Sequence, residues 1–397
     1  MYGQYPIENA EIEIANTGNP DIPIEVIQTD ANGLTERVAL SAPPLEFSMT
    51  PTDNQPYSEY NIKIRAATYE QQIISGVQIF SGENGNQQIR LRRQSSDEET
   101  YNPIAIGPHT LWGEFPPKIA EEETKPVNET GEIVLSRVVV PEYIVVHDGA
   151  PTDTTAMDYY VQYKDYIKNV ASCEIYSTWP AATIEANILA IMSFTLNRVY
   201  TEWYRNKGYN FTITSSTAYD HKWMHNKTTY DSISRVVDRI FNQYLSRPNV
   251  TQPILTQYCD GKRVTCPNWL SQWGSKYLGD QNYSALDILR YYYGSNMYIN
   301  TAESISGIPA SWPGYELTIG SSGDKVRQMQ EQLNRIAQNY PAIPRITVDG
   351  IYGSQTADAV RTFQEIFNLP ATGTVDFSTW YEISEIYVAV SRIAELN

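Results

Sequence analysis

The feature that most constrains the fold is a change of hydrophobic periodicity along the chain. Residues 7–93 alternate apolar and polar side chains between Gly, Asn and Pro turns, a pattern that predicts antiparallel strands. From Tyr159 onward the apolar residues recur every three or four positions, which predicts amphipathic helices. At roughly 100–200 residues per domain, the 397 residues are enough for two to four domains.

Two stretches without periodicity separate the predicted domains. The first is rich in Pro, Glu and Thr and is expected to be an exposed linker, and the second is rich in Gly, Pro and Ser. The chain is therefore predicted to be multidomain: an all-β sandwich at the N-terminus, a central α+β domain and an all-α C-terminal domain of three helices. The predicted boundaries are 1–93 for the sandwich, 94–137 for the linker, 138–310 for the central domain and 311–397 for the C-terminal domain.

The charge balance excludes some classes of partner. The net charge is −17, and the first 140 residues hold 21 acidic and 9 basic side chains. A nucleic-acid-binding protein needs a basic surface that neutralises phosphates, so no nucleic acid is expected as a partner. No apolar run approaches the roughly 18 residues that a membrane span requires, so no membrane span is expected either.

The C-terminal segment carries the most specific pattern. It contains GSSGDKVRQMQEQLNRI, followed by VDGIYGSQTADAVRTFQEIFNLPATGTVDFSTW. This pattern resembles peptidoglycan-binding domains of the three-helix type, with helices expected over 324–338, 355–367 and 378–396. The resemblance implies that bacterial cell-wall peptidoglycan is the ligand of this domain.

The central segment resembles lytic transglycosylase domains of the SpoIID/LytB family. Residues 166–198 contain a Glu, a short loop, a Trp-Pro pair and a long helix, and residues 268–299 contain a Ser-Gln-Trp-Gly turn before a helix that ends in a Tyr run. The resemblance implies that Glu174 is the catalytic acid and base of glycan cleavage. The family also has a Lys and an Arg on the long helix, where this chain has Glu185 and Met192.

The same resemblance points to residues that would contact the glycan. They lie in a Tyr-Asp-His segment and in the Ser-Gln-Trp turn, and their aromatic, imidazole and amide groups suit sugars and acyl carbonyls. The expected substrate-binding residues are Tyr219, Asp220, His221, Ser271, Gln272 and Trp273. A structural role in a loop or in the core is the alternative for each of them.

The order of the three parts is similar to that of clostridial germination-specific spore cortex-lytic enzymes. The turns and strands of residues 7–93 resemble those of transthyretin-like domains. In the cortex-lytic family the chain is a zymogen, and a subtilisin-like Csp protease removes the N-terminal part. The resemblance places the chain in the spore cortex or outer spore layers, outside the cytoplasm. It places the processing at Ser136, Arg137, Val138 and Val139.

Two alternatives to a lytic transglycosylase stay open at this point. Cys173 could be the nucleophile of a cysteine peptidase or amidase, with His147 or His221 as the base. A non-catalytic peptidoglycan-binding scaffold is the second alternative, since the Lys and Arg of the family helix are missing.

The remaining cysteines leave a further choice between two structures. Cys259 and Cys266 could form a disulfide, or they could hold a structural zinc ion together with two histidines, because two thiolates and two imidazoles suit tetrahedral zinc. The zinc ligands would be Cys259, Cys266, His221 and His225. The expected reaction itself requires no cofactor.

Overall fold

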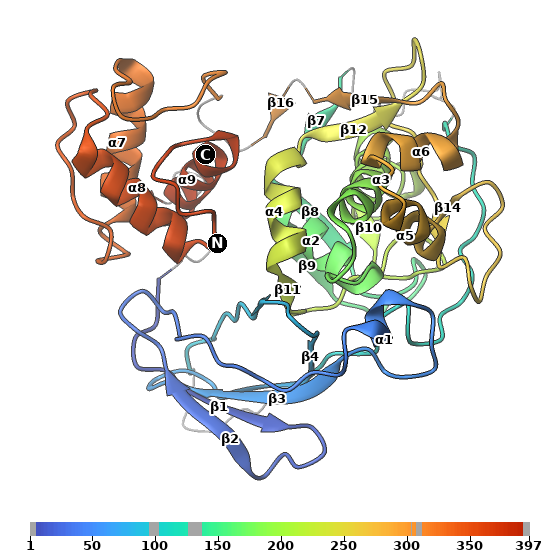
Figure 1. Ribbon diagram of the computed structural model, residues 1–397, viewed down its shortest axis with the longest axis horizontal. Helices are drawn as coiled ribbons and strands as arrows, with labels where there is room; N and C mark the ends of the chain where they lie inside the picture. The colour runs from blue at the N-terminus through green and yellow to red at the C-terminus, as the bar shows by residue number, and fades with distance from the viewer. Residues whose placement is uncertain (1–4, 95–102, 126–136, 303, 307–311, 392–397) are drawn as a thin grey trace.

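The computed structural model describes residues 5–94, 103–125, 137–302, 304–306 and 312–391. Within these ranges the chain forms a sheet-rich N-terminal region, a central region of helices and short strands, and a helical C-terminal region (Figure 1). No helix in the described ranges is long and apolar enough to cross a membrane.

The N-terminal region is built on a sheet whose strand order is β2, β1, β3, β4 and β6 among the described residues. All pairs are antiparallel except β4 with β6. The alternation in the sequence puts Ile62, Ile64 and Ile74 on one buried face. The elements are β1 (Glu11–Asn16), β2 (Pro23–Gln28), α1 (Glu46–Met49), β3 (Ser58–Arg65), β4 (Gln72–Ile79) and β6 (Ile104–Ala105).

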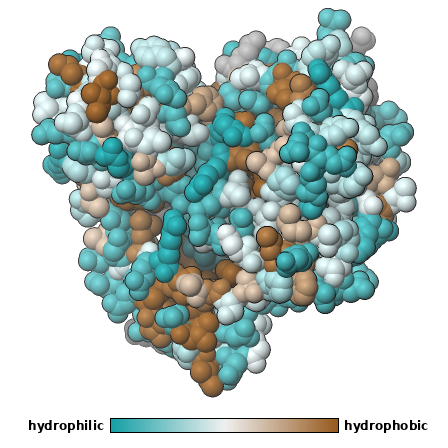
Figure 2. Space-filling model, viewed as in Figure 1, coloured by the Kyte–Doolittle hydropathy of each residue, from teal (hydrophilic) through white to brown (hydrophobic). Residues whose placement is uncertain are grey.

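The described residues of the N-terminal region form this one main sheet, whereas the sequence predicted a two-sheet sandwich. The buried face packs against Cys173 and Met224 of the central region in place of a second sheet. Alternation therefore predicted correctly that one face is buried, but it does not say against what. On the edge strand β2, Ile24 and Val26 are about half exposed, and Figure 2 shows apolar surface gathered at this end of the molecule.

Residues 103–125 are not an exposed linker, which corrects the expectation for 94–137. The segment leaves the sheet and runs along the central region, in teal in Figure 1. His109 within it is fully buried. Glu121 pairs with the buried Arg198 at 2.5 Å. The composition of this segment is that of a solvated linker, but Lys118, Glu121 and Glu123 have partners in another part of the chain.

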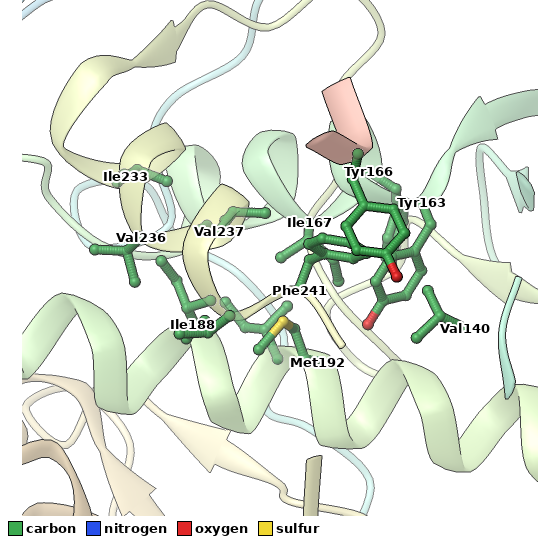
Figure 3. Close-up of a cluster of buried hydrophobic side chains, with 14 of the residues drawn as sticks. Val140, Tyr163, Tyr166, Ile167, Ile188, Met192, Ile233, Val236, Val237 and Phe241 are labelled. Carbon is green, nitrogen blue, oxygen red and sulfur yellow. The ribbon is translucent and has the colours of Figure 1, made fainter. Parts of the chain in front are cut away.

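The central region surrounds the long helix α3 (Ala181–Tyr200), which is buried on nearly every side. Pro180 is its N-cap residue, a position where the missing N–H costs no helical hydrogen bond. Figure 3 shows one part of the core, where side chains of α2, α3 and α4 meet. The helices around α3 are α2 (Tyr163–Glu174), α4 (Asp231–Ile240), α5 (Gln272–Asp280) and α6 (Ala285–Tyr293), with a 3-10 turn at Arg205–Lys207.

Short strands complete the central region. β8 (Tyr143–His147) lies between β9 (Asp158–Gln162) and β10 (Ile213–Thr214). The other pairs are β7 (Val139–Val140) with β16 (Ser304–Ile305), β12 (Gln243–Ser246) with β15 (Tyr298–Thr301), β13 (Tyr258–Cys259) with β14 (Leu270–Ser271), and β11 (Thr229–Tyr230) with β5 (Gly85–Asn86). The β11–β5 pair joins the central region to the N-terminal region.

The C-terminal region consists of the helices α7 (Asp324–Ile336), α8 (Ser354–Ile366) and α9 (Phe377–Ser391) in its described part. Its core contains Phe363 and Trp380, as the helical spacing predicts. Gly350 turns the chain before α8 with φ of 76°, and its N–H donates to the side-chain carbonyl of Gln330 at 2.8 Å. The sequence therefore located all three helices to within a few residues.

Candidate active site

Glu174 is the last residue of α2 and is only 4% exposed. Both of its carboxylate oxygens accept hydrogen bonds: Oε1 from the backbone N–H of Lys222 at 2.7 Å, and Oε2 from the side-chain amide of Gln272 at 3.2 Å. The same Gln272 amide also donates to the backbone carbonyl of Glu174 at 2.8 Å. These contacts from two distant segments fix the direction in which the carboxyl group points.

The Ser-Gln-Trp turn, which the resemblance implied would contact the glycan, lies beside Glu174, and its side chains contact other groups of the protein. Ser271 caps α5 by accepting from the N–H of Gly274 at 2.9 Å. Gln272 is 3% exposed and holds Glu174. Trp273 is partly buried, and its ring lies 5.0 Å from that of Trp179. Gln272 therefore has the geometry of a positioning residue for Glu174.

Asp220 of the Tyr-Asp-His segment is fully buried. Its carboxylate accepts hydrogen bonds from Arg198 Nε at 2.8 Å, the Tyr204 hydroxyl at 2.6 Å, and the N–H and hydroxyl of Thr214 at 3.0 and 2.7 Å. Tyr219 is partly exposed, and its carbonyl accepts from Arg198 at 3.2 Å. The surroundings of Asp220 are those of a carboxylate that neutralises a buried arginine.

His221 is also fully buried, with its Nδ1 3.2 Å from the hydroxyl of Tyr166. Its ring packs against Phe194 at 4.4 Å and Tyr258 at 5.7 Å. Burial keeps the pKa of His221 well below its ordinary value, and the positive charge of Lys118 adds to this effect. The imidazole is therefore neutral in the folded protein.

Tyr258 is a site residue that the sequence did not reveal. It is buried, and its pKa is raised well above the ordinary value, first by burial and then by the negative charge of Glu174. The parallel pairing of β13 with β14 brings it beside the Ser-Gln-Trp turn. Because 84 positions separate Tyr258 from Glu174, no local spacing could have connected them.

Cys259 and Cys266 form a disulfide, which decides between the two alternatives for this pair. Their sulfurs are therefore not available as zinc ligands. His225 stacks on Tyr159 at 4.5 Å, and His221 lies among aromatic rings. Among the described residues no group of three or more His, Cys, Asp or Glu side chains is placed to hold a metal ion, so the zinc set is not brought together.

Cys173 does not have the surroundings of a nucleophile. Its thiol is fully buried and contacts the side-chain oxygen of Asn169 at 3.6 Å. Burial raises the pKa of Cys173 to about 12, which keeps the sulfur protonated. The two histidines considered as its base are engaged elsewhere: His147 with Asp158 at 2.7 Å, and His221 with Tyr166.

Of the four expected processing residues, Ser136 lies outside the described ranges. Arg137 is exposed, and Val138 is buried. Val139 starts β7, which pairs with β16. Among the three described processing residues, Arg137 is therefore the exposed one.

Comparisons with known proteins agree with the pattern in the C-terminal region. Residues 322–383 match the PG_binding_1 family model, which describes a peptidoglycan binding domain. No curated protein matches the chain. The crystal structure of the SleB N-terminal domain matches at 30% identity over 18% of this chain and 93% of that chain, with a TM-score of 0.16. The chain therefore carries a C-terminal peptidoglycan-binding domain.

Proposed function

We propose that this chain is the zymogen of a spore cortex-lytic enzyme of the SleC type, which cleaves peptidoglycan glycan strands as a lytic transglycosylase. The carrying observation is the buried Glu174 carboxyl group, which two distant segments hold in one orientation within a chain that also has a peptidoglycan-binding domain. In the spore, the enzyme would act outside the cytoplasm on the cortex. A Csp-type protease would remove the N-terminal part.

A lytic transglycosylase can work with one carboxyl group. In its protonated form Glu174 gives its proton to the glycosidic oxygen as the bond from that oxygen to the anomeric carbon of muramic acid breaks. The 6-hydroxyl of the same muramic acid then bonds to the anomeric carbon, and the Glu174 carboxylate takes the hydroxyl proton. The enzyme ends in its starting state, no water is consumed, and the product carries a 1,6-anhydromuramic end.

The residues around Glu174 support this role by restricting its motion. Gln272 and the Lys222 N–H contact opposite oxygens of the carboxyl group, so rotation of the group would break at least one hydrogen bond. Catalysis by a positioned proton donor depends on such restriction, because a displacement of about 1 Å can cost about a hundredfold in rate.

The C-terminal region is attached to the helix that ends in Glu174. Lys164 in the first turn of α2 pairs with Glu382 at 2.5 Å and with Glu385 at 2.7 Å, both on α9. A domain that holds the wall polymer raises the local substrate concentration, which favours an enzyme that works on an insoluble substrate.

The test is muropeptide mass spectrometry of decoated spore cortex after incubation with the full chain, either untreated or treated with a subtilisin-like protease and then washed with salt to remove the N-terminal part. We expect anhydromuramic ends from the treated protein and none from treated Glu174→Gln. Glu185→Gln is the matched control, since Glu185 pairs with Arg239 on the surface and should not affect cleavage. Wall binding without new ends would reject the enzyme and leave a binding scaffold. Cut peptides with intact glycan would instead favour a peptidase.

A further inference from the structure

Part of the N-terminal half of the chain lies directly over the residues that flank Glu174. The N–H and hydroxyl of Thr110 both donate to the carbonyl of Cys173, at 3.2 and 2.8 Å. The ring of His109 lies 3.2 Å from the carbonyl of Ile175. Residues 108–125, here called the strap, therefore contact the chain on both sides of Glu174.

Lys118 of the strap enters the site itself. Its ammonium group donates to the carbonyl of Asp220 and lies 5.4 Å from the ring centre of Phe194 and 4.9 Å from that of Tyr258. Burial lowers the pKa of Lys118, and the negative charges of Glu174 and Asp220 partly offset this effect. A cation of the strap is thus placed within electrostatic reach of the candidate catalytic carboxylate.

Beyond Lys118, hydrogen bonds and ion pairs hold the strap against the central region. The main chain of Ile119 exchanges hydrogen bonds with the carbonyl of Ala218 at 2.7 Å and the Gln257 amide at 2.6 Å. Two ion pairs follow, Glu121 with Arg198 at 2.5 Å and Glu123 with Arg247 at 2.6 Å. The strap therefore binds the central region through main-chain hydrogen bonds and paired charges.

The opposite end of the strap is held by an arginine of the disulfide loop. Arg263 donates to the backbone carbonyls of Leu111, Trp112 and Gly113. The ring of Phe115 lies under the ammonium group of Lys222, the residue whose N–H holds Glu174. The strap is in this way fixed on both sides of Lys118.

We infer that the strap is an intramolecular inhibitor that blocks the approach of a glycan strand to Glu174, and that a single cut near Arg137 leaves it bound. This inference rests on the proposed function. The cut falls 12 residues after Lys125 and breaks none of the contacts given above. Departure of the strap is therefore an event separate from the cut, and it is the departure that gives the glycan access to Glu174.

The first test uses the uncut full chain, so that no fragment has to fold alone. Glu121→Gln with Glu123→Gln weakens the anchor, while Glu114→Gln with Glu122→Gln removes the same charge from two exposed positions of the strap. We expect the anchor variant to release anhydromuramic ends from decoated cortex about tenfold faster than wild type, which corresponds to about 1.4 kcal/mol. The control pair should match wild type, and adding Glu174→Gln to the anchor variant should abolish the gain.

A second measurement follows the strap without relying on activity. Mass spectrometry after brief treatment with an amine-acetylating reagent should show Lys118 protected in wild type and in protein cut near Arg137, and modified in the anchor variant. The cut N-terminal part should also co-elute with the rest of the chain at low salt.

The outcomes separate this inference from the proposed function. Equal rates for the anchor variant and wild type, with cut and salt-washed protein active, would overturn the strap as inhibitor and leave the enzyme intact. Loss of the N-terminal part immediately on cutting would contradict the claim that the strap stays bound after the cut. Inactivity of cut, salt-washed protein that still binds cortex would reject the proposed function instead.

Discussion

Replacing Asp220 by Asn tests whether this residue is structural, as its surroundings indicate, or a substrate contact, as the resemblance implied. Asp220 and the Arg198 side chain are both fully buried, and the carboxylate accepts four hydrogen bonds. Asn removes one of the two negative charges beside Arg198, the other being Glu121, and directs an amide donor at groups that are themselves donors. Breaking a buried ion pair from one side costs about 3–5 kcal/mol. On a scale of about 2–4 °C per kcal/mol, Tm should fall by roughly 6–20 °C.

The assay is thermal unfolding of the full chain, followed by circular dichroism, together with a cortex pelleting assay. Asp358→Asn serves as the control, because Asp358 lies on the surface and pairs only with the exposed Arg361 among the described ion pairs, so its Tm should change little. If Asp220→Asn keeps the Tm of wild type and loses cleavage or binding, the structural reasoning is refuted and the substrate role is supported.

Three further predictions concern other buried groups. Gln272→Met should slow cleavage by the protease-treated protein about 10–100-fold, because a hydrogen bond to a charged group contributes about 1.5–3 kcal/mol, while cortex pelleting should be unchanged; an unaltered rate would contradict a positioning role. Cys173→Ala should preserve the cleavage rate and lower stability by about 1 kcal/mol in urea unfolding, whereas lost cleavage in a folded variant would revive the cysteine mechanism. Burial raises the pKa of Glu385 to about 7, above an unfolded value near 4.5. The folded state therefore holds a proton that the unfolded state has released between about pH 4.5 and 7, and the free energy of unfolding falls as pH rises through this window. Glu385→Gln should thus be more stable than wild type at pH 8 and gain less at pH 5 in urea unfolding, and an equal gain at both pH values would contradict the assignment.

The elements that the sequence predicted well are those that depend on neighbours in the chain. The C-terminal helices were located because each buries a stripe that repeats every 3.6 residues and because Gly350 marks the turn between two of them. Glu174 was found because a Trp-Pro pair and a long helix follow it within a few residues. Its catalytic role stays a prediction that the Glu174→Gln experiment will test.

The features that the sequence did not predict depend on contacts between residues that are far apart in the chain. Glu121 looks like a solvated acid in a linker, and only the fold brings it to Arg198, 77 positions later. In the same way, the sheet alternation could not reveal that its buried face meets Cys173 rather than a second sheet. The composition of a segment predicts whether that segment alone would be solvated or buried. The prediction is wrong where a residue far away in the chain binds the segment.

The two ends of α2 suggest how inhibition and wall binding can coexist in one chain. Lys164, near the start of the helix, pairs with α9 of the peptidoglycan-binding region, and Glu174, at its end, lies under the strap. Ten residues separate them, which is about 15 Å of rigid helix. None of the strap contacts given above involves Lys164 or α9, so departure of the strap leaves the ion pairs of Lys164 with α9 in place. An uncut chain could therefore bind the wall first, with Glu174 already held at a fixed distance from the bound polymer when the strap leaves.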